Sequence, residues 1–198
     1  MHHRRQLLSA AALAGLAVPA LSNAQHAPKT LRGPVLLTIS GVIGAGNRGP
    51  LDPALDRLMF KKKLKFDKAQ VFDFAALTAM PAVTIKPTLE YDNQPHTLKG
   101  PLLVDVMKAC GVNSSEKMTF FMREVDGYAA QVSAADAVKY RFIVATHLDG
   151  RPLSMGGLGP LWGIYDADRF PDMAAKPLAE RFVACPWATY HIEVKVSS

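Results

Sequence analysis

The stretch from Met118 to Asp166 decides the fold, and it reads MTFFMREVDGYAAQVSAADAVKYRFIVATHLDGRPLSMGGLGPLWGIYD. Two apolar runs in this stretch, Met118–Arg123 and Phe142–Ala145, have the composition of β-strands. Each run leads to an Asp-Gly pair, Asp126-Gly127 after the first and Asp149-Gly150 after the second. Glycine tolerates positive φ and aspartate can bond its own backbone, so both pairs predict tight turns.

A glycine-rich loop follows and leads into a third strand. Gly156, Gly157 and Gly159 precede the apolar run Leu161–Tyr165, which carries Trp162. A glycine-lined loop beside an aromatic strand lets a flat ligand approach backbone and ring together. This part of the chain is therefore a candidate ligand site.

The remaining segments predict a mixture of strands and short helices in one domain over residues 33–198. Apolar alternation and capping residues place these elements. We expect strands over Pro34–Ser40, Val83–Lys86 and Ala188–Val196, and helices over Phe74–Met80, Pro101–Cys110, Ala134–Lys139 and Pro177–Ala184. With more strand than helix, the pattern predicts a strand-rich α+β fold.

The N-terminus has the pattern of a cleavable secretory signal. A basic start at Arg4-Arg5 is followed by the apolar run Leu7–Val18 and by the small-x-small pattern Ser22-Asn23-Ala24. We expect residues 1–24 to be removed, residues 25–32 to form a mobile leader and the mature protein to be periplasmic. Arg4-Arg5 also partly matches a twin-arginine signal, so both export routes stay open.

The charge of the chain argues against a nucleic-acid partner. The formal net charge is +6 and falls to +4 without Arg4 and Arg5, which is only mildly basic. The densest positive stretch is Arg57–Lys68, in which Lys61, Lys63 and Lys65 alternate with Leu64 and other residues. That period of two predicts a solvated strand face, or a surface that docks an acidic partner or lipid headgroups.

The order of motifs resembles the molybdopterin-binding domain of the sulfite oxidase superfamily. The matching elements are a strand, DGY, a strand, DG-x-PL, G-G-x-GP and an apolar strand with an acidic end. Upstream, VLLTISG and FDFAALTAMPAVTIKPTLEYDNQPHTLKGPLLVDVMKACG fit the same order. The resemblance covers roughly residues 33–196 and implies the fold of that domain.

Two departures from the family bear on its metal. The family's molybdenum-binding cysteine follows the strand that here reads VTIKPTLEYDNQP, which contains no cysteine. Pro186 stands before Trp187 where the family often has lysine. Cys110 and Cys185 lie elsewhere in apolar surroundings, as buried thiols or as a disulfide pair. The chain therefore resembles the small periplasmic pterin-binding offshoot of the superfamily, the PruR-like proteins, and we expect no molybdenum.

The resemblance implies a pterin, such as the reduced pterin tetrahydromonapterin, as the ligand. A flat heterocycle needs an aromatic ring to stack on, a carboxylate for its N–H edge and backbone groups at close range. The residues that offer these groups are Glu90, Arg123, Asp126, Tyr128, Gly156, Gly157, Gly159, Trp162, Tyr165 and Asp166. Each has a structural interpretation as well: Trp162 as a core residue, Asp126 as a turn former.

The predicted function is ligand binding without catalysis. The resemblance implies a protein that regulates an inner-membrane diguanylate cyclase/phosphodiesterase, a c-di-GMP signalling enzyme, through the periplasmic domain of that enzyme. The alternatives are a small molybdopterin-dependent oxidoreductase and an interaction module without a ligand. The histidines are scattered without a zinc-binding spacing, and Ser154 lacks the G-x-S-x-G context of a hydrolase nucleophile. We therefore predict no catalytic or metal-binding residue.

Overall fold

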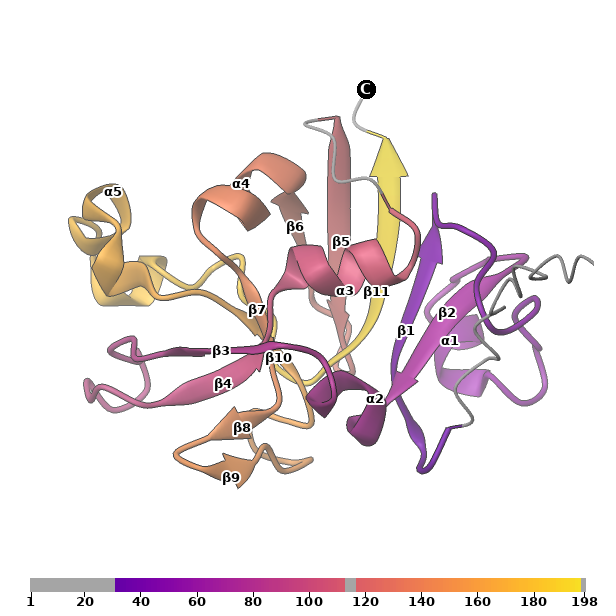
Figure 1. Cartoon of the computed structure of the whole chain (residues 1–198), viewed down its shortest axis with the longest axis horizontal. Coiled ribbons are helices and arrows are strands. Elements are labelled where there is room, and N and C mark those ends of the chain that lie inside the picture. The colour runs from indigo at the N-terminus through magenta and orange to yellow at the C-terminus, as the bar shows by residue number, and fades with distance from the viewer. Residues whose placement is uncertain (1–30, 113–116, 197–198) are drawn as a thin grey trace, which may run out of the picture.

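A five-stranded sheet holds the first and last described strands side by side at its centre in the computed structural model (Figure 1). The structure describes residues 31–112 and 117–196. The strand order is β2-β1-β11-β5-β6. These strands are β1 (Val35–Gly41), β2 (Ala69–Asp73), β5 (Met118–Glu124), β6 (Ala129–Ser133) and β11 (Thr189–Val196). Only β1 and β11 pair in parallel in this sheet, and its other neighbours are antiparallel.

Two smaller sheets extend the molecule beside the five-stranded sheet. One has the order β3-β4-β8-β9 and the other pairs β10 with β7. Their strands are β3 (Ala82–Ile85), β4 (Leu98–Pro101), β7 (Ile143–Ala145), β8 (His147–Leu148), β9 (Arg151–Pro152) and β10 (Trp162–Ile164). A β-bridge between Leu102 and Ile143 connects them. The described part of the chain is therefore a strand-rich α+β fold, as the sequence predicts.

The helices are short and connect the strands. They are α1 (Arg57–Lys61), α2 (Phe74–Thr78), α3 (Leu103–Ala109), α4 (Ala134–Lys139), α5 (Pro171–Ala174) and the 3₁₀ turns η1 (Ala167–Arg169) and η2 (Leu178–Glu180). α3 and α4 pack on each other, and α4 packs on β5 and β6 (Figure 1). Within the described ranges, no helix is both long and apolar enough to span a bilayer.

Strand alternation divides the five-stranded sheet into a core-facing side and an outer side. On β5, Phe120, Met122 and Glu124 are buried, whereas the residues between them are partly exposed. Ile192 and Val194 of β11 belong to the same core. Because successive side chains point to opposite faces, Glu124 and its neighbour Arg123 lie on opposite sides of the sheet. This separation determines which predicted site residues can meet.

Several local predictions are confirmed. Asp126-Gly127 turns β5 into β6, with Gly127 at a φ of 114°. Asp149-Gly150 joins β8 to β9, and both residues have positive φ. α4 occupies the predicted range, because the Ser133 hydroxyl accepts a hydrogen bond from the Asp136 N–H and caps the helix.

Three predictions of local structure are wrong. Lys61 ends α1 and the residues after it form a turn, so the alternation of Lys61, Lys63 and Lys65 is not a strand. Pro101 belongs to β4, and α3 begins at Leu103. In the segment Pro177–Ala184 only η2 is helical, and further along it the carbonyls of Arg181 and Val183 accept hydrogen bonds from tyrosine hydroxyls.

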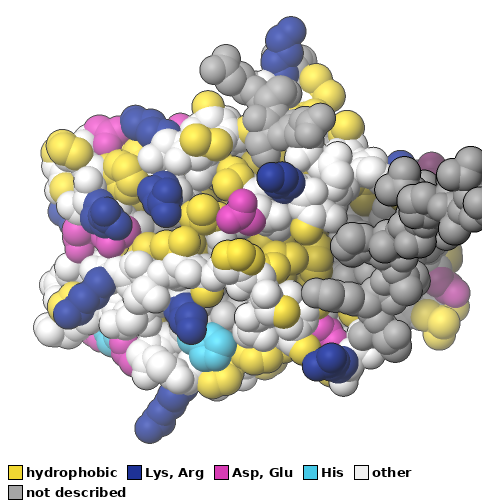
Figure 2. Space-filling model, viewed as in Figure 1, with side chains coloured by type: hydrophobic (Ala, Val, Ile, Leu, Met, Phe, Trp, Pro, Cys, Tyr) yellow, Lys and Arg dark blue, Asp and Glu magenta, His cyan; other side chains and the backbone are white. Residues whose placement is uncertain are grey.

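Figure 2 shows one face of the molecule, where hydrophobic side chains reach the surface across the middle among scattered charged ones. Cys110 and Cys185 are both buried and free, so they form no disulfide in this structure. The predicted signal peptide and most of the predicted leader lie outside the described residues.

Candidate functional site

The site is a pocket of about 360 Å³ that gathers three of the predicted ligand residues, Glu90, Asp126 and Tyr128. Glu90 lies in the loop between β3 and β4, and the other two lie in the turn between β5 and β6. We call it the carboxylate pocket. Its lining consists of acidic, aromatic and apolar side chains: Glu90, Tyr91, Glu124, Asp126, Tyr128, Ala179, Phe182, Val183, Cys185 and Trp187.

Glu124 and Asp126 give the pocket its chemistry. Glu124 is 4% exposed at the end of β5, whereas Asp126 lies exposed in the turn. Burial, the charge of Asp126 and a hydrogen bond to Asp126 raise the pKa of Glu124 to about 7, against the opposing effect of the Trp187 N–H. The raised pKa is what a buried carboxyl group beside a second carboxylate is expected to have.

Among the described residues, the carboxylates of this pocket have no cationic side chain as a salt-bridge partner. Glu90, Glu124 and Asp126 form no ion pair with any lysine, arginine or histidine of residues 31–112 and 117–196. Structural carboxylates in a partly buried site are ordinarily neutralised by such partners. An acidic pocket of this kind is complementary to a ligand that donates several N–H groups.

Aromatic rings surround the mouth of the carboxylate pocket. Tyr128 is 45% exposed, and its hydroxyl donates a 2.6 Å hydrogen bond to the Val183 carbonyl, which fixes the ring. Tyr91 is 55% exposed on the neighbouring loop, and Trp187 is half-buried. Rings held at a pocket mouth offer flat surfaces on which a heterocycle can stack.

Trp162 and Tyr165 lie in the core and do not line the carboxylate pocket. Trp162 is 1% exposed, and its indole N–H donates to the Cys185 carbonyl at 2.9 Å. The Tyr165 hydroxyl donates to the Arg181 carbonyl at 2.5 Å. Together with Tyr128, these aromatic residues secure alternate carbonyls of the segment 181–185. That segment forms one wall of the pocket, so the two buried rings support the site from behind.

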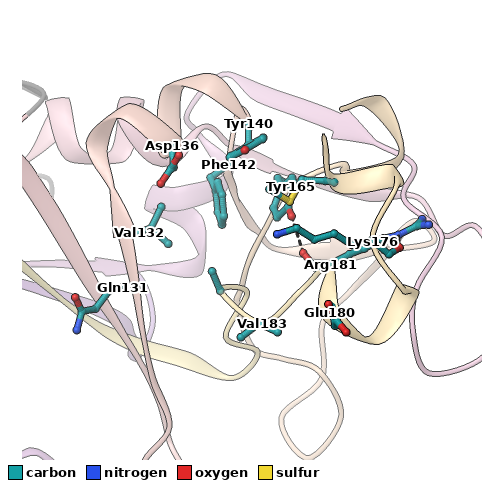
Figure 3. Close-up of a pocket in the computed structure, with 12 residues that line it drawn as sticks. Gln131, Val132, Asp136, Tyr140, Phe142, Tyr165, Lys176, Glu180, Arg181 and Val183 are labelled. Atoms are coloured by element: carbon teal, nitrogen blue, oxygen red, sulfur yellow. Dashed lines mark hydrogen bonds between the residues drawn. The ribbon is translucent and has the colours of Figure 1, made fainter. Parts of the chain in front are cut away.

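Tyr165 also borders a second cavity, of about 260 Å³ (Figure 3). In the close-up, Tyr140, Phe142 and Tyr165 lie on one side of this cavity, and Arg181 lies opposite with its carbonyl bonded to Tyr165. Arg181 pairs with Asp168 at 2.8 Å. Tyr165 is the one predicted ligand residue that lines this cavity, whereas the carboxylate pocket gathers three.

The other predicted residues do not line the carboxylate pocket. Arg123 lies on the outer side of the sheet. Asp166 is buried, and one carboxylate oxygen accepts from the Lys86 N–H at 3.2 Å, whereas the other has no partner in the described part of the chain. Gly156 and Gly157 are exposed, whereas Gly159 is buried, and a Cβ atom there would lie 2.5 Å from the Leu153 backbone. Close packing accounts for the glycine at position 159.

The sequence reasoning missed Glu124, Tyr91 and Trp187. Glu124 could have been recognised from the alternation of β5, because it follows Phe120 and Met122 at the next core-facing position, where an apolar residue is expected. An acid at a core-facing position is a rare feature that indicates function or a pKa shift. Tyr91 and Trp187 carry no such local signal, because the fold alone brings their loops together.

The donor set does not fit a thiolate-bound molybdenum. Burial raises the pKa of both Cys110 and Cys185, which opposes the thiolate form that such a metal requires. Cys185 does line the carboxylate pocket, but no cluster of three His, Cys, Asp or Glu residues suited to a metal occurs in the described ranges. The pocket's carboxylates and rings fit an organic heterocycle better.

Comparisons with known proteins give distant likenesses to solved structures only. No protein-family model matches the chain, and no curated protein matches it in sequence. Among solved structures, it is similar to the sulfane dehydrogenase SoxCD from Paracoccus pantotrophus, with a TM-score of 0.48 and 12% identity. The match covers 80% of this chain and 37% of that chain, so this chain spans little more than a third of its length. A likeness this distant assigns neither a family nor a ligand.

Proposed function

We propose that this protein binds a pterin in the carboxylate pocket and carries no metal redox centre. The observation that carries the proposal is the Glu124–Asp126 pair, two carboxyl groups without a cationic partner in the described chain beside exposed aromatic rings. The amino and ring N–H groups of a pterin donate side by side along one edge. A carboxylate accepts two such hydrogen bonds at once, which makes this edge a good match.

The size and lining of the pocket also support a small flat ligand. Its volume of about 360 Å³ lies at the lower end of the range for small-molecule sites. Tyr128 is held by its hydrogen bond to Val183, so its ring loses little freedom when a ligand stacks on it. The walls contributed by Phe182 and Trp187 add apolar contact.

We further propose that the bound protein regulates the periplasmic domain of an inner-membrane diguanylate cyclase/phosphodiesterase. A protein without catalytic residues acts through a partner that distinguishes its free and bound states. Tyr91, Tyr128 and Val183 are exposed around the pocket mouth. Exposed tyrosines are enriched at protein interfaces, and a partner seated here would contact the ligand directly. We therefore propose that the partner contacts the protein at the pocket mouth.

The alternative, a molybdopterin-dependent oxidoreductase, finds support only in Cys185, the one thiol that lines the pocket. Pterin and molybdenum contents of protein purified from its native compartment separate the two functions. The proposal predicts stoichiometric pterin by mass spectrometry and no stoichiometric molybdenum by elemental analysis. Molybdenum at one atom per chain would overturn it in favour of the oxidoreductase.

The regulatory step has its own test. The periplasmic domain of a candidate cyclase/phosphodiesterase is immobilised, and retention of this protein is measured with and without tetrahydromonapterin. We expect retention to differ between the two states, and Tyr91→Ala, at a residue that also lines the pocket, to weaken retention by a larger factor than it weakens pterin binding. Equal retention in both states would leave the protein a pterin binder without this regulatory role.

A further inference from the structure

The outer side of the five-stranded sheet carries a second polar cluster, which is mainly cationic, whereas the carboxylate pocket is acidic. His191 pairs with Arg123 across β11 and β5 and is followed on the same face by Glu193 and Lys195. Arg123 donates to Glu193 at 2.7 Å and to His191 Nδ1 at 3.3 Å. Because arginine only donates, neutral His191 carries its proton on Nε2 and donates to the Ser40 hydroxyl, 2.9 Å away.

The turn after α1 covers this cluster and closes a cavity of about 260 Å³. The Phe66 ring stacks on His191 with a centroid separation of 6.3 Å, which anchors the turn to the sheet. We call this cavity the cationic pocket. Its lining is Lys62, Lys63, Leu64, Lys65, Arg123, His191, Glu193 and Lys195.

The charges of the cationic pocket do not balance. Five of its lining side chains are cationic and one, Glu193, is acidic. Glu193 is already paired with Arg123 and with Lys195, at 2.7 and 3.3 Å. Burial and the nearby Arg123 lower the pKa of His191 to about 3, so the imidazole adds no charge at neutral pH. Lys62, Lys63 and Lys65 have no ion-pair partner within residues 31–112 and 117–196.

The backbone conformation of Lys63 supports a functional role for this lysine. Its φ is 60°, the left-handed conformation in which a helix usually ends on glycine. Side chains at such positions are strained, and the strain persists where the surroundings or the function require the residue. Here the conformation directs a cationic side chain into the lining of the pocket.

From these observations we infer that the cationic pocket binds the phosphate group of a small or lipid-borne dianion. The ammonium groups of Lys62, Lys63 and Lys65 form no ion pair among the described residues, and beside Arg123 they provide the charge and the donors that a tetrahedral dianion requires. Lys62 also donates a hydrogen bond to the Asp126 carbonyl, so Lys63 and Lys65 carry most of the inference. The volume accommodates one phosphate group with a small substituent. The two pockets share no lining residue, and binding of phosphate here does not require that a pterin bind in the carboxylate pocket.

Because Lys63 has a left-handed conformation, it can be replaced by glycine without destabilising the fold, so a loss of binding would not be due to misfolding. Lys63→Gly removes one ammonium group and relieves the left-handed strain, so its melting temperature should equal or exceed that of the wild type. Lys61→Gln is the matched control. It removes the same charge two residues away, from a side chain that does not line the cationic pocket.

Titration calorimetry with inorganic phosphate and co-sedimentation with vesicles are both carried out at low ionic strength. The vesicles contain phosphatidic acid, whose phosphomonoester can carry two negative charges, or phosphatidylcholine as the zwitterionic reference. We expect the wild type to bind phosphate, anionic vesicles or both, and Lys63→Gly to weaken that binding about fivefold. Lys61→Gln should bind nearly as the wild type does. Binding of phosphate identifies a soluble ligand, and binding of vesicles alone identifies a lipid headgroup. No binding by the wild type, or equal loss in both variants, would overturn the inference.

Discussion

The ammonium group of Lys62 donates a hydrogen bond of 2.9 Å to the backbone carbonyl of Asp126. This contact joins the turn that covers the cationic pocket to the turn that lines the carboxylate pocket. A Cβ atom on Gly127 would lie 2.5 Å from Lys62 Nζ, so the glycine leaves room for the contact. Lys62 therefore holds the Asp126 turn in place from the other side of the sheet.

Lys62→Met should loosen the Asp126 turn and weaken pterin binding. A hydrogen bond of this kind contributes about 0.5–1.5 kcal/mol, which corresponds to about a twofold to tenfold loss of affinity. Titration calorimetry with tetrahydromonapterin measures the effect, with Lys61→Met as the control. Equal affinities of Lys62→Met and wild type would show that the turn needs no such anchor.

Glu124→Gln should stabilise the folded protein above pH 7. The folded pKa of Glu124, about 7, lies above its ordinary value of 4.5, so the folded state binds the proton more tightly. The contribution of this group is therefore fully present below about pH 4.5 and is lost as the pH rises through about 7. The loss amounts to at most about 3 kcal/mol, and the neutral amide avoids it.

Denaturant unfolding of wild type and Glu124→Gln at pH 5 and at pH 8 measures this difference. The advantage of the glutamine variant should grow between these two pH values. An advantage that is the same at both would mean that Glu124 is ionised in the folded protein throughout the range.

Trp162→Phe should cost stability and leave pterin affinity unchanged. The substitution leaves space in the core and removes the indole N–H that satisfies the Cys185 carbonyl, a combined cost of about 2–4 kcal/mol. Thermal unfolding and pterin titration on the same samples separate the two roles. A variant of normal stability with weakened pterin binding would instead assign Trp162 to ligand stacking.

His96 should stabilise the loop before β4 in a pH-dependent way. Hydrogen bonds to Asp149, at 2.7 Å, and to Asp92, at 2.8 Å, raise the pKa of His96 above its ordinary value of about 6.5. The stabilisation by His96 is therefore complete below about pH 6.5 and is lost as the pH rises through the raised pKa. Amide exchange at Thr97, whose N–H bonds Asp149, should show less protection above that pKa.

His96→Gln should remove this pH dependence, and His147→Gln should not. Both substitutions replace an imidazole, but among described residues only His96 bridges two carboxylates. If the protection of Thr97 were independent of pH in the wild type, His96 would be neutral throughout and the bridge would carry no charge.

Local signals in the sequence predicted much of the fold. The Ser133 cap and the two Asp-Gly turns act within a few residues, and the structure has each of them where the sequence indicates. The alternation of Lys61, Lys63 and Lys65 wrongly predicted a strand. Of the residues between these lysines only Leu64 is buried, and the preceding residues form α1. A period of two in charged residues does not indicate a strand unless the intervening positions are consistently apolar.

The site was harder to predict, because its members meet only through long-range pairing. The parallel pairing of β1 with β11 brings the end of the described chain to the centre of the sheet, and Trp187 comes with it. Sequence periodicity does not specify strand order. Arg123 lies apart from the carboxylate pocket, because Arg123 and the pocket residue Glu124 are adjacent on β5 and face opposite sides of the sheet.

The central claim is that the carboxyl pair of Glu124 and Asp126 recognises a pterin, and calorimetric titration with tetrahydromonapterin under anaerobic conditions tests it most directly. Asp126→Asn keeps the side-chain oxygen that accepts from the Tyr128 N–H but removes the charge, and Asp105→Asn removes an exposed charge elsewhere as the control.

We expect the wild type to bind with an affinity that falls as the pH is lowered through about 7, because protonated Glu124 loses its charge and one of its carboxyl oxygens becomes a donor. Asp126→Asn should lose about tenfold or more in affinity, and Asp105→Asn should bind as the wild type does. A wild type that binds no pterin, or an Asp126→Asn variant with wild-type affinity, would contradict the claim.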